Sequence, residues 1–322
     1  MKRLHGGASD PALLDFSANV NPLGPPDAVL AVLSKGTELV SRYPDPGARD
    51  FCAAAANHHE IPQDCILAGN GSSDLIYLVA QLFTGERARV IVPAFTEYED
   101  ACEAAGLHVD DGARTLTFLG NPTSPEGRLI PREEILGMPG TLVIDEAFMD
   151  FVEDQESLVT QAARDPRLIV IRTLTKFYAI PGLRLGYLVS VPETISRLWR
   201  LQPPWSVNAL AEAAGTAALG DPRYAAFTRK FIRERREELS RGLRKTGLDL
   251  HPSTANYILC RVPDAELLCR ELLGHGIAAR NCDSFSGIEK NRYVRFAVRK
   301  RSDNQQLLSA LEEVFKKCPA AP

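Results

Sequence analysis

No apolar run in the sequence approaches the ~18 residues that a membrane-spanning helix needs, so we expect no membrane segment. The opening residues carry no apolar stretch of the kind found in signal peptides. The 7 cysteines are scattered without a C-x-x-C pair, which disfavours both a zinc site and a disulfide framework. A net charge of only −4 gives no indication of nucleic-acid binding. These absences favour a cytoplasmic protein with reduced thiols that binds no metal, no nucleic acid and no membrane.

What remains is the composition of an ordinary globular protein. Of 322 residues, 45% are hydrophobic and 24% are charged, and the length suggests roughly two domains. Helical spacing of apolar residues and the positions of proline and glycine predict helices over 48–59, 222–244, 264–273 and 302–316. Short apolar runs predict buried strands, among them 168–171, 185–189, 257–262 and 293–298.

The most informative stretch is 173–187, which lies between two of these apolar strands. Lys176 follows the hydroxyls of Thr173 and Thr175 and precedes Arg184. A lysine at the end of a buried strand is costly unless it is paired, titrated or covalently used. The hydroxyls and the arginine could hold a phosphate dianion, and a phosphate beside an imine-forming lysine indicates pyridoxal 5'-phosphate (PLP). Taken alone, the Thr-Lys pair would also fit an exposed loop.

This stretch resembles the lysine signature of the class I and II PLP-dependent aminotransferases, S/T-x-S/T-K followed by G-x-R. The resemblance covers nearly the whole chain. It implies a fold-type-I α/β enzyme with a mostly parallel seven-stranded sheet in a large domain and a smaller α+β domain. We therefore expect 1–40 to form an N-terminal arm and part of the small domain, 41–222 the large PLP-binding domain, and 223–322 the C-terminal small domain.

Further segments follow the order of this family. A strand, a glycine turn and a helix start at 66–76 would bind the cofactor phosphate, although a lone G-x-G also occurs in dinucleotide folds. The strand 141–145 ends in an aspartate suited to the cofactor's ring N–H. The resemblance implies an aromatic ring stacked on the cofactor and an asparagine on its 3′ oxygen. The expected cofactor-binding residues are Gly71, Ser72, Ser73, Tyr98, Asn121, Asp145, Thr173, Thr175, Lys176 and Arg184, with Lys176 also catalytic.

Two features depart from the family pattern. Asn121 follows Tyr98 after only 23 residues, whereas most relatives have a longer connection there. Phe148 stands where aminotransferases usually have a tyrosine. In contrast, the segment R-Y-P-D agrees with the family, in which its tyrosine reaches the cofactor phosphate of the neighbouring subunit. We therefore expect a homodimer with shared active sites, completed by Tyr43.

A narrower resemblance lies in the N-terminal H-G-G and D-F-S-A-N-V-N-P-L-G segments, which are similar to those of threonine-phosphate decarboxylases of cobalamin biosynthesis. This implies conversion of L-threonine O-3-phosphate to (R)-1-aminopropan-2-ol O-phosphate. Two converging guanidinium groups would suit a phosphorylated amino-acid substrate, because it carries both a carboxylate and a phosphate. The expected substrate-binding residues are His5, Gly6, Asn19, Asn121, Arg280 and Arg295.

Alternatives remain at this stage. An aminotransferase of the histidinol-phosphate type would share the same cofactor residues, and a non-catalytic PLP-fold binding or regulatory module would share the fold. The intact Lys176, Asp145 and Arg184 argue against the non-catalytic module. The sequence does not distinguish phosphothreonine from phosphoserine, because a methyl-sized difference in a pocket has no motif.

Overall fold

The computed structural model describes residues 6–152 and 156–317. Its strands are β1 (Leu14–Asp15), β2 (Ile66–Gly69), β3 (Arg87–Val90), β4 (His108–Val109), β5 (Leu116–Gly120), β6 (Thr141–Asp145), β7 (Leu168–Thr173), β8 (Gly186–Val189), β9 (Asp249–Leu250), β10 (Tyr257–Arg261), β11 (Ile277–Ala278), β12 (Arg280–Asn281) and β13 (Tyr293–Ala297). Its helices are α1 (Asp27–Leu33), α2 (Gly36–Leu39), α3 (Arg49–His59), α4 (Ser72–Leu82), α5 (Glu97–Ala104), α6 (Arg132–Leu136), α7 (Val159–Ala162), α8 (Pro192–Leu201), α9 (Ala209–Leu219), α10 (Pro222–Lys245), α11 (Ala265–Gly274) and α12 (Arg301–Lys317).

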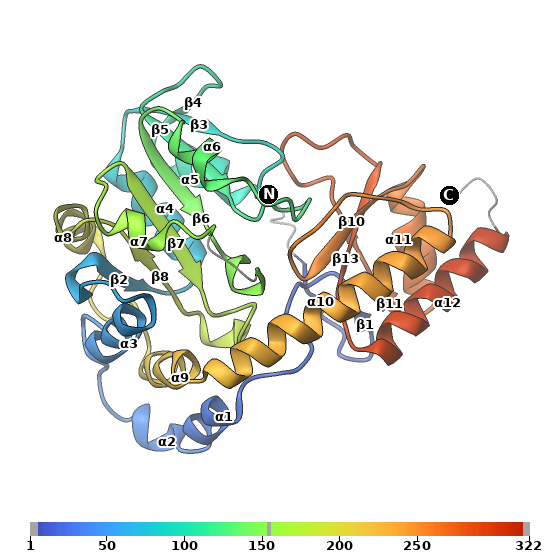
Figure 1. The fold of residues 1–322 in the computed structure, drawn as a ribbon, viewed down its shortest axis with the longest axis horizontal. Coiled ribbons are helices and arrows are strands. Elements are labelled where there is room, and N and C mark those ends of the chain that lie inside the picture. Colours follow the sequence, from blue (N-terminus) through green and yellow to red (C-terminus); the bar gives the residue numbers. More distant parts are fainter. Residues whose placement is uncertain (1–5, 153–155, 318–322) are drawn as a thin grey trace.

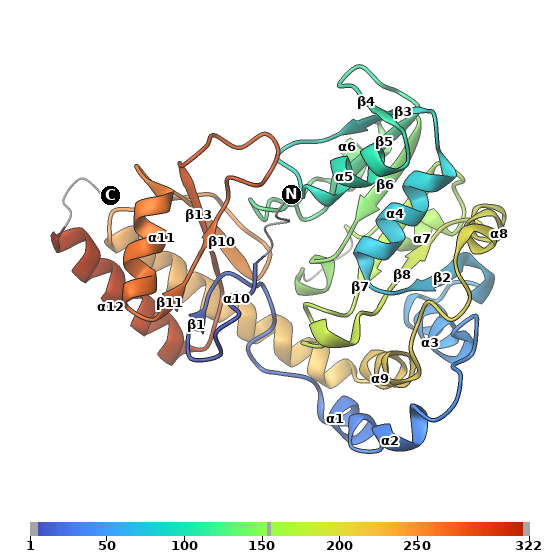
Figure 2. The ribbon, with the colours of Figure 1, turned by 180° about the vertical axis from the view of Figure 1, so that it is seen from behind.

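The large domain contains a seven-stranded sheet in the order β2-β8-β7-β6-β5-β3-β4 (Figure 1). The neighbours from β7 to β4 pair in parallel, and β8 pairs antiparallel with both β7 and β2. The predicted α/β fold with a mostly parallel seven-stranded sheet is therefore confirmed. The carboxyl ends of β5, β6 and β7 meet at one edge, which faces the small domain (Figure 2).

Strand periodicity explains why helices cover both faces of this sheet. Along β7, Leu168 and Val170 belong to one apolar core, and Ile169 and Ile171 belong to the other. Successive side chains of a strand point to opposite faces, so an unbroken apolar run must be covered on both sides. Helices α3, α6, α7 and α9 contribute buried residues to the first core, and α4, α5 and α8 contribute to the second.

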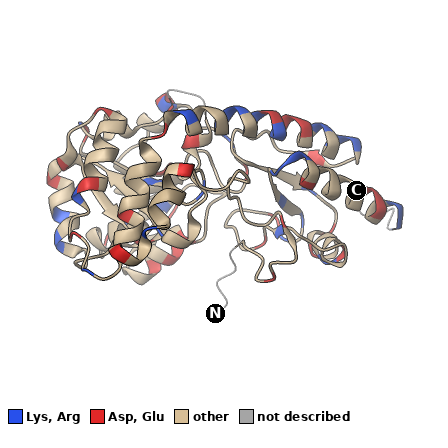
Figure 3. Ribbon diagram, turned by 90° about the horizontal axis from the view of Figure 1, so that it is seen from below, with Lys and Arg blue, Asp and Glu red and all other residues tan. Residues whose placement is uncertain are grey.

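The small domain is built on the antiparallel sheet β12-β13-β10-β9, against which α11 and α12 pack. The long helix α10 extends from the large domain to this sheet (Figure 1). It begins where the Asp221 side chain accepts a hydrogen bond from the Tyr224 N–H at 2.9 Å, with Pro222 in the first turn. Acidic and basic residues are mixed along it (Figure 3). No helix in the described ranges is long and apolar enough to cross a membrane.

The N-terminal segment divides between the two domains. Strand β1 pairs in parallel with β11 of the small domain, as expected for the arm. Helices α1 and α2, however, pack on the alanine-rich α9 of the large domain. Residues 27–39 thus contact α9, whereas we expected all of 1–40 to belong to the arm and small domain; the domain division stays a prediction. The contact forms because the apolar side of α1, including the fully buried Val29, finds its packing partner in the large domain.

Candidate active site

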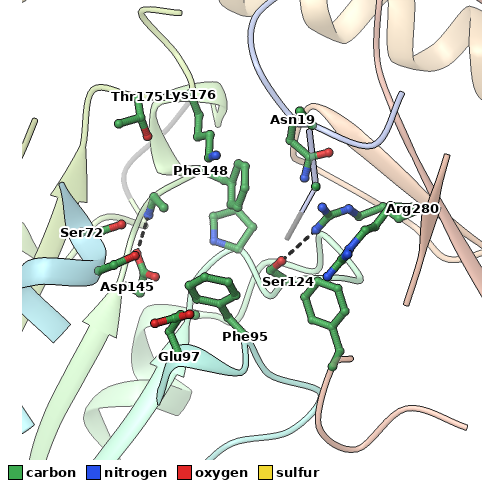
Figure 4. A pocket seen from close by; sticks show the side chains of 18 of the residues that line it. Asn19, Ser72, Phe95, Glu97, Ser124, Asp145, Phe148, Thr175, Lys176 and Arg280 are labelled. Atoms are coloured by element: carbon green, nitrogen blue, oxygen red, sulfur yellow. Dashed lines mark hydrogen bonds between the residues drawn. The ribbon is translucent and has the colours of Figure 1, made fainter. Parts of the chain in front are cut away.

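A cavity of about 440 Å³ lies between the edge of the large sheet and the small-domain sheet. Asp145 at the end of β6 and Lys176 just beyond the end of β7 enter it (Figure 4), and Gly120 at the end of β5 also lines it. Arg280 and Arg295 enter it from β12 and β13. The carboxyl ends of parallel strands are the usual place for ligands in open α/β sheets. The fold thus brings together residues that are far apart in the sequence.

The Asp145 carboxylate is held in this cavity by two hydrogen bonds. The hydroxyl of Tyr98 donates to Oδ2 at 2.9 Å, and the N–H of Ala147 donates to Oδ1 at 3.0 Å. Burial raises the pKa of Asp145 to about 6, although these hydrogen bonds oppose the shift. Within residues 6–152 and 156–317, no ion pair includes this carboxylate. A bound cation, such as a protonated ring nitrogen, would stabilise its charged form.

The residues at the start of α4 form a site suited to an anion. Gly71 precedes the helix with φ +86°, and Ser72 and Ser73 of its first turn line the cavity. A Cβ on Gly71 would lie 2.8 Å from Nη2 of Arg184, so the close approach of this guanidinium requires glycine. The backbone N–H groups of a helix start, with a guanidinium beside them, form an arrangement that binds phosphate.

Thr175 and Lys176 line the cavity beyond the end of β7. The Thr173 hydroxyl lies 3.0 Å from the Thr175 hydroxyl and donates to the Leu185 carbonyl at 3.0 Å, which fixes the turn. Burial, reinforced by the positive charges of nearby arginines, lowers the pKa of Lys176 to about 8. The neutral amine, which is the form that attacks a carbonyl, is therefore more abundant than in a free lysine.

Two arginines form the opposite wall of the cavity. Arg280 and Arg295 are directly opposed in the antiparallel register of β12 and β13. Nη1 of Arg295 donates to the Ser124 hydroxyl at 3.1 Å. With the Asn19 amide oriented so that its oxygen faces Arg295, this oxygen accepts from Nη1 and Nη2, both at 3.2 Å. Burial lowers the pKa of both guanidinium groups, so an anion bound beside them would be stabilising.

The structure brings most of the expected residues together around this one cavity. The cavity is lined by the predicted residues Gly6, Asn19, Ser72, Ser73, Tyr98, Asp145, Thr175, Lys176, Arg184, Arg280 and Arg295. Gly71 and Thr173 lie behind it, in contact with Arg184 and Thr175 respectively. His5 lies outside the described residues.

Asn121, expected to contact both the cofactor and the substrate, is not among the residues that line the cavity, and its role stays a prediction. Its side-chain oxygen accepts from the Ile130 N–H at 2.8 Å, and its Nδ2 donates to the Ile130 carbonyl at 3.1 Å. Its neighbours Gly120 and Pro122 line the cavity, whereas Asn121 itself is fully buried. Asn121 therefore closes the turn that leads to Ile130, and one amide hydrogen remains for a ligand.

Tyr43 does not line the cavity of its own chain. Its side chain is 83% exposed, and its ring lies 5.0 Å from that of Trp205 between centroids. Its participation in an active site thus requires a second subunit and stays a prediction.

Sequence reasoning missed two aromatic residues of the cavity, Phe95 and Phe285. The side chain of Phe95 lies in the cavity (Figure 4). The ring of Tyr98 instead stacks on Phe118, with centroids 6.0 Å apart, and its hydroxyl donates a hydrogen bond to Asp145. The stacking role expected for Tyr98 therefore suits Phe95 better. The sequence does contain a signal, because Phe95 and Tyr98 are about one helical turn apart. Which of the two rings faces the cofactor, however, depends on packing.

The chain is similar in sequence and in fold to known PLP-dependent enzymes. The family model described as "Aminotransferase class I and II" matches residues 11–117 and 110–311. The threonine-phosphate decarboxylase of Salmonella typhimurium is 38% identical over 340 residues, covering 96% of this chain and 93% of that protein. The structure of the histidinol-phosphate aminotransferase from Clostridium acetobutylicum has a TM-score of 0.86 at 30% identity, covering 94% of this chain and 99% of that one.

A further solved structure carries the cofactor that the sequence analysis expected. The histidinol-phosphate aminotransferase from Sinorhizobium meliloti, in complex with pyridoxal-5'-phosphate, has a TM-score of 0.85 at 23% identity, covering 93% of this chain and 90% of that one. The predicted fold-type-I architecture is confirmed by these similarities. The chain belongs to the class I and II aminotransferase family of PLP-dependent enzymes.

Proposed function

We propose that this chain binds PLP in the cavity and decarboxylates L-threonine O-3-phosphate to (R)-1-aminopropan-2-ol O-phosphate for cobalamin biosynthesis. The observation that carries the proposal is the pair Arg280 and Arg295, which share one cavity with Lys176. A substrate with both a carboxylate and a phosphate gives each guanidinium group an anionic partner. The 38% identity to the Salmonella typhimurium decarboxylase supports the same reaction.

The residues present fit PLP at three of its functional groups. The start of α4 with Arg184 suits its phosphate, Asp145 suits its ring nitrogen, and Lys176 suits its aldehyde. The ring of Phe95 offers a flat apolar surface to the pyridine. When bound, PLP withdraws electrons from the α-carbon of an amino acid, so that a bond to this carbon can break heterolytically.

The chain's own residues decide which bond breaks by orienting the substrate. Arg280 and Arg295 bind its anionic groups, and Asn19 holds the guanidinium of Arg295 in place. In the proposed reaction the bond between the α-carbon and the carboxylate breaks, CO2 leaves, and a proton is added to the α-carbon. Nζ of Lys176, with its pKa of about 8, is suited to donate this proton.

A second candidate is transamination of a phosphorylated amine, as in histidinol-phosphate aminotransferases. The 30% identity to the Clostridium acetobutylicum enzyme over 94% of this chain supports it. Histidinol phosphate, however, carries a phosphate and no carboxylate. In its half-reaction Arg280 and Arg295 would share a single anion, whereas phosphothreonine offers each guanidinium group its own, which makes this candidate the weaker fit.

The deciding experiment supplies PLP-loaded protein with L-threonine O-3-phosphate and no keto acid. We expect CO2 and aminopropanol phosphate in equal amounts over many turnovers, and no product with the Lys176→Ala variant. Product that appears only with 2-oxoglutarate, together with glutamate and without CO2, would assign the protein to the aminotransferases instead.

A further inference from the structure

The loop 282–292, between β12 and β13, connects the small domain to the large domain. The N–H of Ala94 donates to the Ser286 carbonyl at 3.1 Å in an isolated antiparallel bridge. The Ser286 hydroxyl donates to the carboxylate of Glu99 on α5. Gly287 has φ +75°, and a Cβ there would lie 2.5 Å from a valine side chain of the large domain. The loop is therefore fastened to the large domain at consecutive residues.

The same loop also contacts both arginines of the cavity. Nη2 of Arg280 donates to the Ser284 hydroxyl at 2.7 Å. The ring of Phe285 lies 5.5 Å from Cζ of Arg280 and 5.3 Å from Cζ of Arg295, measured to its centroid. Both distances allow a favourable interaction between the guanidinium and the aromatic ring. Phe285 is 4% exposed and lines the cavity, so one ring contacts both cationic groups.

Phe285 is in turn connected to the part of the cavity suited to the cofactor. It forms a small apolar cluster with Leu259 and Cys282, and Phe95 packs against this cluster. The ring of Phe95 meets that of Tyr98 edge-on at 5.9 Å, and Tyr98 donates to Asp145. A continuous line of contacts thus runs from the arginine pair to the carboxylate suited to the cofactor's ring nitrogen.

We propose that Phe285, held by the 282–292 loop, fixes the arginine pair relative to the cofactor site and thereby selects substrates by the number of carbons between the α-carbon and the phosphate. Ser284 and Phe285 contact the arginines, while Ser286 bonds the loop to the large domain and Gly287 allows its close approach there. Phe285 is then a specificity-determining residue and Gly287 a positioning residue. This inference rests on the proposed function in taking a phosphorylated amino acid as the ligand.

The test compares L-threonine O-3-phosphate with L-homoserine O-phosphate, whose phosphate is one carbon further from the α-carbon. Rapid mixing with PLP-loaded protein gives each Kd from the initial change in cofactor absorbance, before turnover. We expect the wild type to prefer the threonine ester by about 10-fold or more, the usual scale for one methylene, and Phe285→Ala to bring the two Kd values within about 3-fold. Phe285→Leu should keep part of the preference, because it retains an apolar side chain.

Two further variants separate this role from a general loss of structure. Gly287→Ala keeps the Phe285 side chain but displaces the loop that holds it, so it should also reduce the preference. Phe227→Ala removes a phenylalanine of α10 that is 59% exposed and lies outside the cavity wall, and it should leave both Kd values unchanged. PLP content and the melting temperature are measured for every variant. If Phe285→Ala fails to fold, Phe285→Leu and Gly287→Ala decide the question.

The outcomes distinguish this inference from the proposed function. A wild type that prefers the threonine ester without releasing CO2 would contradict decarboxylation, and loss of that preference in the variants would still support the role of Phe285. Release of CO2 combined with an unchanged preference in Phe285→Ala and Gly287→Ala would overturn the inference alone. A wild type that binds neither ester, or does not discriminate between them, would also overturn it.

Discussion

Lys176 and Asp145 have pKa values shifted toward each other by the same cause. Burial raises the pKa of Asp145 from 3.8 to about 6 and lowers that of Lys176 from 10.5 to about 8. Without a cofactor, Asp145 therefore reduces stability as the pH rises from about 4 to about 6, because the folded chain keeps a proton over this range that the unfolded chain has released. Lys176 restores stability as the pH rises above about 8, because the unfolded chain then binds more protons. Near pH 8, ionised Asp145 and neutral Lys176 coexist, as PLP binding requires.

The pKa of Lys176 gives a prediction at the scale of one residue. After burial, the charge of Arg295 is the next largest cause of its lowering, so Arg295→Gln should raise this pKa. The rate of covalent PLP uptake should rise with pH through about 8 in the wild type and at higher pH in the variant. Uptake at pH 7 should slow several-fold, because each unit of pKa changes the neutral fraction about tenfold.

Stopped-flow absorbance of the bound cofactor would measure these profiles. Arg301→Gln is the matched control, since Arg301 is exposed and pairs with Glu238 away from the cavity. Coincident profiles for the wild type and Arg295→Gln would show that Arg295 does not influence the amine.

The sequence was most informative for residues whose role depends on covalent chemistry or charge. Lys176, Asp145 and Arg184 each stand at or near the end of an apolar run, and the structure brings all three into the cavity wall. The choice between Phe95 and Tyr98 could not be made in this way. It depends on how the first turn of α5 is rotated against Phe118, and this rotation is set by packing across the sheet.

At the scale of elements, hydrogen bonds and ion pairs fix the end of β6 on both faces of the sheet. Asp145 faces the cavity, and Glu146 belongs to a buried ion cluster behind it. Nη1 of Arg172 on β7 donates to Glu146 at 2.7 Å, and Nη2 donates to Asp150. The N–H of Leu158 also donates to Glu146, at 2.7 Å. Because a buried charge without its partner is strongly destabilising, this cluster fixes the strand end that carries Asp145.

The turn before α4 gives a prediction for an element. In Gly71→Ala the new methyl group would displace the Arg184 guanidinium, from which its Cβ would lie only 2.8 Å, so PLP should bind about tenfold more weakly or worse. Gly85→Ala is the matched control, because its φ of +82° is similar and nothing lies within 4 Å of its Cβ. Both variants should lose stability because a positive φ is unfavourable for alanine, and Gly71→Ala should lose about 1–3 kcal/mol, since its ψ of 172° lies in a region that essentially only glycine occupies.

Equilibrium titration with PLP and urea unfolding would measure the two effects separately. Equal losses of PLP affinity in Gly71→Ala and Gly85→Ala would mean that backbone strain, and not the contact with Arg184, is responsible.

Long elements were predictable and very short ones were not. Helix α10 is 24 residues long, begins with a capping residue and a proline, and contains both acidic and basic residues. The expected range 222–244 agrees with it to within one residue. Strands β9, β11 and β12 have two residues each, too few for an alternating pattern. Arg280 lies on one of these strands, so only the resemblance to the family indicated its role. The contacts that fasten the 282–292 loop to the large domain join distant segments and leave no local pattern.

At the scale of the whole molecule, the cavity depends on both domains and on the segment that precedes them. The N–H of Asn21 donates to the Lys176 carbonyl at 3.0 Å, and Nδ2 of Asn21 donates to the Phe177 carbonyl at 2.9 Å. The N-terminal segment is thus fastened to the lysine turn. Near it, the large side chains of Val40 and Tyr43 are 62% and 83% exposed. Exposed apolar surface of this kind is suited to a second subunit.

We predict that Tyr43 completes the site of a neighbouring subunit in a homodimer. Tyr43→Phe should then weaken PLP binding about tenfold by removing one hydrogen bond to the phosphate. The decisive measurement uses heterodimers of a Lys176→Ala chain and a Tyr43→Phe chain, isolated with two different tags. If Tyr43 acts across the interface, one site carries both defects and the other carries neither. Each heterodimer should therefore bind one borohydride-fixable PLP with wild-type affinity. If Tyr43 acts within its own chain, the site that retains Lys176 also carries the Tyr43→Phe change, and that PLP should bind with the weaker affinity of the Tyr43→Phe homodimer.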